Sequence, residues 1–282
     1  MTNESGSSGD HLPLYKVRAR NTSVTSENKI HDDETAARFG FRGGLVPGVT
    51  VYGYMTVPLV AQFSDRWLER GSMQVKFHQP FYEGEQVCVR AEVDSDSDPV
   101  KVVIKAERED GTVCATALAT IDDQSEWLGV ALLEDYPVHP LPSFDERPKA
   151  ARETIVKGAL LGTLTEKLDL TNSTLLREIG EPLLIYYGER AVAHPAILLG
   201  LANQALMNNF MLGPWIHTAS DLINWSAARD GEEISVRGCI SDAFERKGHE
   251  FITLDLLLVA NETRIVEQVR HTAIYRIADR GV

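Results

Sequence analysis

The chain has 282 residues and a mass of 31.3 kDa, which suits two domains of about 100–150 residues better than one small module. Hydrophobic residues make up 43% of the sequence and charged residues 24%, a globular composition that argues against a disordered or fibrous chain. The 41 acidic and 28 basic residues give a net charge of −13, which argues against binding to nucleic acid or to an anionic membrane.

Targeting and redox signals point to one compartment. The N-terminal sequence MTNESGSSGDH lacks the basic start and apolar core of a signal peptide. The largely apolar run at residues 254–260, which contains Asp255, is far shorter than the ~20 residues of a membrane span. Cys88, Cys114 and Cys239 are odd in number and have no CxxC spacing. We therefore expect a cytoplasmic protein with reduced thiols and no membrane association.

An internal repeat divides the chain. Gly53 and Gly200, each within an apolar segment, lie 147 positions apart, and Gly84 and Gly231, each in a polar turn, have the same offset. Similar alternation of apolar residues follows both turns, which indicates a duplication. We expect a disordered tail at 1–11, an N-terminal domain at 12–125, an acidic and proline-rich connector at 126–154, and a C-terminal domain at 155–282.

Each copy contains the same predicted elements in the same order. An extended segment, 15–25 or 162–171, precedes a helix that is apolar on nearly every face, at 49–68 (kinked by Pro58) or 196–211. Four antiparallel strands follow each helix, at 72–81, 85–93, 100–107 and 112–121, and again at 219–228, 232–240, 250–259 and 263–277. This pattern predicts an α+β chain with a tandem (double) hot-dog fold, each copy having a long central helix wrapped by a curved antiparallel sheet.

The segment between the first strand and the first helix carries the most informative motif. It reads SENKIHDD at 26–33, then GF at 40–41 and VPG at 46–48. It resembles the signature of the MaoC-like dehydratases, or (R)-specific enoyl-CoA hydratases, approximately G-D-x-N-P-[ILV]-H-x-D followed by [IV]-H-G. The family's asparagine and histidine fall on Asn28 and His31. Its catalytic aspartate falls on Ser26, and its histidine before the helix falls on Pro47, which are departures from the pattern.

The resemblance implies a hydro-lyase that reversibly hydrates an enoyl thioester. Such a reaction needs a general base, a general acid and donors for the enolate oxygen. The expected catalytic positions are His31 for proton transfer, the N–H of Gly48 for the enolate, and Ser26 in place of the aspartate. The positions expected to contact substrate are Asn28, Asp33, Val46, Pro47, Tyr52 and His194, the last being the counterpart of Pro47 in the second copy.

Several alternatives stay open. A carboxylate from Glu27, Asp32 or Asp33 could replace the missing aspartate, although Asp33 also suits the N-cap of a short helix at 34–39. The serine at position 26 equally fits a catalytically degenerate acyl-binding protein. A thioesterase ranks third, because the acidic residues of the first helix, Asp65 and Glu69, come late in it.

The expected ligand is an acyl-CoA or another acyl thioester; the carrier and the acyl chain length stay undetermined. We expect no cofactor and no metal, because no His or Cys pair has ligand spacing. Because such a chain resembles half of a tetrameric hot-dog assembly, we expect it to pair into a homodimer.

Overall fold

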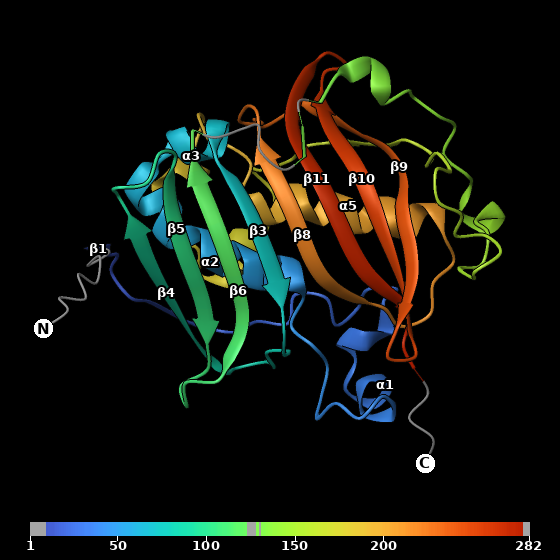
Figure 1. Cartoon of the computed structure of the whole chain (residues 1–282), viewed down its shortest axis with the longest axis horizontal. Helices are drawn as coiled ribbons and strands as arrows, with labels where there is room; N and C mark the ends of the chain where they lie inside the picture. The colour runs from blue at the N-terminus through green and yellow to red at the C-terminus, as the bar shows by residue number, and fades with distance from the viewer. Residues whose placement is uncertain (1–9, 123–127, 130, 279–282) are drawn as a thin grey trace, which may run out of the picture.

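Two long helices lie against one face of a single curved sheet of eleven antiparallel strands (Figure 1). The computed structural model describes residues 10–122, 128–129 and 131–278, so most of the expected tail at 1–11 and part of the expected connector lie outside the described residues. The strands are β1 (Asp10–His11), β2 (Tyr15–Arg18), β3 (Ser72–Phe77), β4 (Gln86–Asp94), β5 (Val100–Glu107), β6 (Val113–Ile121), β7 (Leu164–Lys167), β8 (Ile216–Asn224), β9 (Glu233–Arg246), β10 (His249–Ala260) and β11 (Arg264–Arg276). The α-helices are α1 (Asp33–Arg38), α2 (Gly48–Phe63), α3 (Asp65–Arg70), α4 (Leu175–Ile179) and α5 (Pro195–Asn209).

The two halves of the sheet share one topology. From the outer edge inward, the first half runs β2-β4-β5-β6-β3 and the second runs β7-β9-β10-β11-β8. Pairing of β3 with β8 joins them, and within this pair Gln74 lies opposite Asp221. These two residues are themselves 147 positions apart, the offset of the sequence repeat. The local twofold axis that relates the two halves therefore passes through the Gln74–Asp221 pair.

Helices α2 and α5 begin 147 positions apart. Each helix packs against the sheet and against the other helix. Their enclosed position explains why both are apolar on nearly every face. A Cβ built on Gly53 of α2 would lie 2.9 Å from Cε1 of His194 and 3.1 Å from Cβ of Ala196. Glycine at this position therefore permits the close approach of the two helices. Among the described residues, no helix is both long and apolar enough to cross a membrane.

The single helix that the sequence predicts at 49–68 is two helices. Helix α2 ends at Phe63 because Ser64 has a left-handed φ of 51°, which breaks the helical hydrogen-bond pattern before α3 begins at Asp65. Pro58, expected to kink the helix, lies inside α2. Most strand boundaries lie within three residues of those expected after the two helices, and β5 starts and ends at the predicted residues. The ends of three strands differ more: β3 ends at Phe77 instead of 81, β8 at Asn224 instead of 228, and β9 at Arg246 instead of 240.

We expect three free thiols in the unfolded, unreduced protein. Cys88 on β4 and Cys114 on β6 are separated by β5, and strands two apart in a sheet are about 9–10 Å from each other. A disulfide needs Cα atoms within about 7 Å. Titration with a thiol reagent in denaturant measures the count. A titre of one thiol in freshly purified protein would show a disulfide and contradict this arrangement.

Candidate functional site

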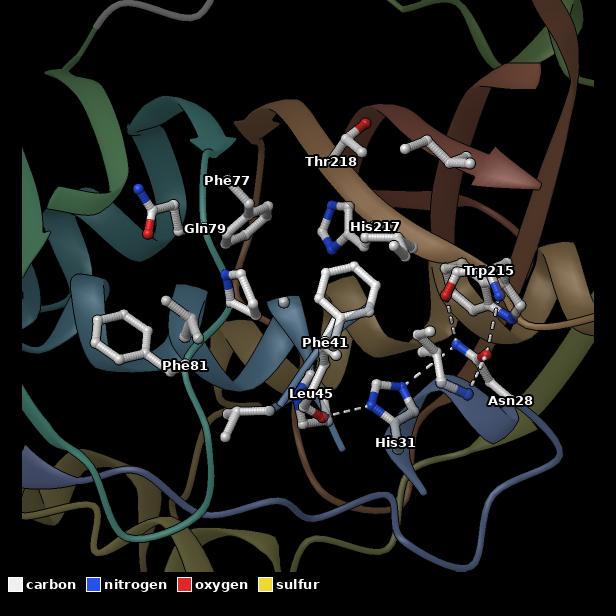
Figure 2. A pocket seen from close by; sticks show the side chains of 18 of the residues that line it. Asn28, His31, Phe41, Leu45, Phe77, Gln79, Phe81, Trp215, His217 and Thr218 are labelled. Carbon is white, nitrogen blue, oxygen red and sulfur yellow. Dashed lines mark hydrogen bonds between the residues drawn. The ribbon is translucent and has the colours of Figure 1, made fainter. Parts of the chain in front are cut away.

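An apolar cavity of about 240 Å³ lies where the two halves meet, beside the N-terminus of α2 (Figure 2). Its walls come from the motif segment, the start of α2, the end of β3 and the residues after it, α5, and the start of β8. The side chains that line it are mostly aromatic or aliphatic, among them Phe39, Phe41, Val46, Val51, Phe77, Phe81, Ile216 and Ile274. None of the described residues that line it is Asp, Glu, Lys or Arg.

His31 lies at one side of this cavity with both ring nitrogens engaged (Figure 2). Its Nδ1 lies 2.7 Å from the carbonyl oxygen of Leu45, so Nδ1 carries the proton and donates it. Its Nε2 lies 3.3 Å from Nδ2 of Asn28 and accepts. Burial lowers the pKa of His31, and the Leu45 carbonyl partly offsets this effect. His31 is therefore a neutral imidazole at pH 7, with the basic lone pair on Nε2.

Asn28 connects the motif segment to the second half of the chain. Its Oδ1 accepts hydrogen bonds from the backbone N–H of Trp215 (3.1 Å) and of Ile30 (3.3 Å). Its Nδ2 donates to the carbonyl of Trp215 at 3.0 Å, which fixes the amide orientation and aims the remaining N–H at His31. Asn28 is buried, so its four contacts hold the 3-10 helix Lys29–His31 against the start of β8.

Replacing Asn28 with aspartate should raise the pKa of His31. The variant removes the N–H that donates to Nε2 and places a carboxylate beside the ring, which favours the imidazolium. NMR titration of the His31 ring measures the pKa, and Asn172→Asp on the exposed surface is the matched control. An unchanged or lower His31 pKa in Asn28→Asp would contradict the contact between the two side chains.

The N-terminus of α2 has no side-chain cap. Its N-cap residue is Pro47, whose carbonyl accepts from the N–H groups of Thr50 and Val51. This leaves the N–H groups of Gly48 and Val49 without an intrahelical partner, as the first turn of any helix does. Val46, Pro47 and Gly48 all line the cavity. The positive end of the helix dipole therefore lies at the cavity wall, suited to developing negative charge.

Gly48 also meets a steric requirement. A Cβ built there would lie 2.8 Å from Nδ1 and 3.2 Å from Cγ of His217, the ring that projects from β8 beside the cavity (Figure 2). Any larger residue would displace His217 or the start of α2.

The carboxylates near His31 in sequence have other partners. Asp32, not Asp33, caps α1, because its Oδ1 accepts from the N–H of Thr35 at 2.9 Å. Asp33 accepts from the N–H of Gly44 at 2.7 Å. Glu27 pairs with Arg147 of the connector region at 3.2 Å. None of these three lines the apolar cavity.

Ser26, the position of the family's aspartate, also lies outside the cavity lining. Its hydroxyl donates to the carbonyl of Asn28 at 3.2 Å, so it stabilises the turn that carries Asn28 and His31. A second, polar cavity of about 660 Å³ lies on the other side of His31, and Asp32 and Asp33 contribute to it. His31 lines both cavities and so stands at their junction.

The corresponding helix start in the second half is closed. His194 is fully buried and caps α5, with its Nδ1 accepting from the N–H of Ala196 at 3.1 Å and its Nε2 3.0 Å from Oε2 of Glu181. The structure thus places His194 away from the cavity that holds His31. Tyr52 is likewise buried and outside the cavity lining, and burial, with Glu267 as a second cause, raises its pKa well above the usual range.

A buried polar cluster that the sequence did not reveal lies on β8 and β11. Nε2 of His217 is 2.8 Å from Oγ of Ser220, and Oγ is 3.0 Å from Nδ1 of His271. Burial lowers the pKa of His217 far below its usual value and that of His271 to about 3, so both rings are neutral. In sequence these residues lie in separate strands, and only the register that sets Ser220 opposite His271 brings them together.

Metal ligation has no support in the part of the chain that the structure describes. It contains no group of three or more His, Cys, Asp or Glu side chains arranged to hold an ion.

Comparison with known proteins gives the fold. No protein-family model matches this sequence, and no curated protein matches it. A MaoC-domain protein from Chloroflexus aurantiacus, named as a dehydratase, superposes with a TM-score of 0.63 at 11% identity, over 97% of this chain and 96% of that chain. A Mycobacterium tuberculosis protein described as having a double hot-dog fold gives 0.59 at 15% identity, over 96% and 97%.

A protein named as a thioesterase shares this architecture. A Lactobacillus plantarum protein named as an oleoyl thioesterase gives a TM-score of 0.54 at 11% identity, over 97% of this chain and 98% of that chain. Identities this low establish architecture and leave the activity open. The chain has the double hot-dog fold and resembles MaoC-like dehydratases over nearly its whole length.

Proposed function

We propose that the chain catalyses the reversible hydration of a neutral enoyl thioester. The observation that carries this proposal is the position of His31, a neutral imidazole with a basic Nε2, at an apolar cavity that also contains the uncapped start of α2. The hydratase motif and the similarity in fold support it. The acyl group would occupy the apolar cavity. The polar carrier arm would occupy the second cavity, so that the reacting carbons lie beside His31.

The chemistry of the site favours a mechanism in which a single base, His31, takes a proton from water and returns it to the substrate. Water would donate a proton to Nε2 of His31 as its oxygen bonds to the β-carbon, displacing the long 3.3 Å contact from Asn28. The electron pair of the Cα=Cβ double bond then joins the α-carbon to the carbonyl carbon, and the carbonyl pair moves to the thioester oxygen, where the N–H of Gly48 would stabilise the enolate. The imidazolium then returns the proton to the α-carbon. Atoms and charge balance without a carboxylate, and no Asp or Glu is among the described lining residues.

The absence of a carboxylate among the described lining residues also bears on the two alternatives, a thioesterase and a non-catalytic acyl-binding protein. A thioesterase on this fold would need an acidic residue near the helix to activate water, and no described Asp or Glu lines the cavity. A non-catalytic acyl-binding protein is the second candidate, because Ser26 replaces the family's aspartate and faces away from the cavity lining.

One assay separates these three functions. The protein is incubated with enoyl-CoA and enoyl-pantetheine substrates of increasing chain length, while absorbance of the conjugated thioester and release of thiol are followed together. We expect the absorbance to fall without thiol release. Thiol release would indicate a thioesterase, and neither change with any substrate would favour the binding protein.

A further inference from the structure

The cavity wall contributed by the second half of the chain contains three buried polar atoms without a hydrogen-bond partner among the described residues. They are Oδ1 of Asn203 on α5, Nε1 of Trp215, and Nδ1 of His217 on β8. Trp215 is 3% exposed and His217 is 6% exposed. By contrast, the polar groups of Asn28 and His31 on the opposite wall have partners. An unpartnered buried polar atom is costly, so these atoms favour a ligand that hydrogen-bonds to them.

The three atoms together select the chemistry of that ligand. The indole N–H of Trp215 can only donate, whereas the amide oxygen of Asn203 can only accept. A group that satisfies both must therefore accept and donate at once, which a hydroxyl group does. A carboxylate fits poorly, because it only accepts, and no described Lys or Arg lines the cavity to balance its charge.

Hydrogen bonds hold the backbone of Trp215 and the ring of His217 in place before a ligand arrives. Asn28 binds both backbone polar groups of Trp215. The ring of His217 is fixed through its Nε2 by Ser220, which is in turn held by His271. The tautomer of this hydrogen-bonded chain decides whether Nδ1 of His217 donates or accepts, and a hydroxyl group can satisfy either.

We infer that Asn203, Trp215 and His217 form a hydroxyl-binding subsite, and that the ligand is an uncharged acyl thioester carrying a hydroxyl group. This inference rests on the proposed function for the thioester, but it concerns binding. The hydroxyl has two sources: the 3-hydroxyl that hydration itself creates, or a hydroxyl further along the acyl chain. The subsite would bind a hydroxyl group from either source by the same hydrogen bonds. Ligands whose hydroxyl group has a known position distinguish the two sources.

Calorimetry with amide analogues of acyl-pantetheine tests the subsite, because the less acidic α-hydrogen of an amide suppresses turnover. The ligands are the butanoyl, 3-hydroxybutanoyl, 4-hydroxybutanoyl and succinyl amides. The proteins are the wild type, Trp215→Phe and Asn203→Leu. The matched control is Trp225→Phe, which removes another buried, unpartnered indole N–H that lies outside the cavity lining. Thermal unfolding establishes that each variant is folded.

We expect the wild type to bind one hydroxylated amide about tenfold more tightly than the butanoyl amide, and the succinyl amide most weakly. Trp215→Phe and Asn203→Leu should each reduce the hydroxyl preference several-fold, and Trp225→Phe should retain it. No hydroxyl preference in the wild type, or an equal preference in all four proteins, would overturn the subsite. Hydroxyl preference in a protein that hydrates no enoyl thioester would overturn the proposed reaction and leave the subsite. Failure of every ligand to bind would overturn the subsite, and the enoyl-thioester assay alone would then decide the proposed reaction.

Discussion

Replacing His31 with alanine is expected to lower the rate of enoyl-thioester hydration by about 10²- to 10⁴-fold, the usual contribution of a general acid–base group. In the proposed mechanism Nε2 of His31 both takes and returns the proton, and none of the described residues that line the cavity is a carboxylate that could replace it. Steady-state kinetics should show the loss mainly in kcat, because the ring is not the main apolar surface that binds the acyl group.

Ser26→Ala is the matched control for this variant. Its hydroxyl supports the same turn through the carbonyl of Asn28 but does not line the cavity, so its loss should cost far less activity. The pH dependence gives a second check: activity should fall on the acid side with an apparent pKa below 6.5, because burial lowers the pKa of His31. Hydration that survives His31→Ala would place the base on another residue.

Burial of Glu267 should make the stability of the folded protein fall as the pH rises. Glu267 is fully buried on β11, neither carboxylate oxygen has a partner among the described residues, and burial raises its pKa from 4.5 to about 8. Below pH 4.5 the carboxyl is protonated in both the folded and the unfolded chain. Between pH 4.5 and 8 the unfolded chain releases this proton and the folded chain keeps it, so stability falls by about 1.4 kcal/mol per pH unit.

Glu267→Gln removes this titration. Urea unfolding should show that, relative to the wild type, the variant gains about 4 kcal/mol of unfolding free energy between pH 5 and pH 8. The histidines His217 and His271 oppose folding at acid pH in both proteins, so the difference between the two isolates Glu267. Glu189→Gln, at an exposed position, is the control. Parallel pH profiles for wild type and Glu267→Gln would show that Glu267 is ionised or solvated in the folded protein.

The sequence predicted the fold well because its periodic signals are local. The apolar helices, the turns at Gly84 and Gly231 and the alternation that follows these turns repeat at one offset, and each element needs only its own residues to be recognised. The break at Ser64 was missed, because nothing in its identity requires a left-handed φ. The capping role was assigned to Asp33 rather than Asp32 because a one-residue shift at a helix start is hard to read from composition.

The site was harder to predict, because its second wall comes from residues more than 150 positions away in the sequence. The motif identified Asn28, His31 and Gly48, which the structure brings to one cavity. It could not indicate Asn203, Trp215 or His217, since their proximity depends on the β3–β8 pairing and on the packing of α2 against α5. His194 is expected at the site as the counterpart of Pro47, but its contact with Glu181 fills the second helix start. Tyr52 is expected there from its place near the start of the first helix, but its side chain is buried outside the cavity lining.

Reaction in water enriched in oxygen-18 distinguishes hydration of the enoyl thioester from its hydrolysis, because it shows which carbon the water attacks. The wild type is incubated with an enoyl thioester, and the product is analysed by mass spectrometry. Hydration predicts an intact 3-hydroxyacyl thioester with one labelled oxygen on the β-carbon, and almost none of this product with His31→Ala. Label in a free carboxylic acid, or an unlabelled and unchanged enoyl thioester, would contradict the proposed hydration.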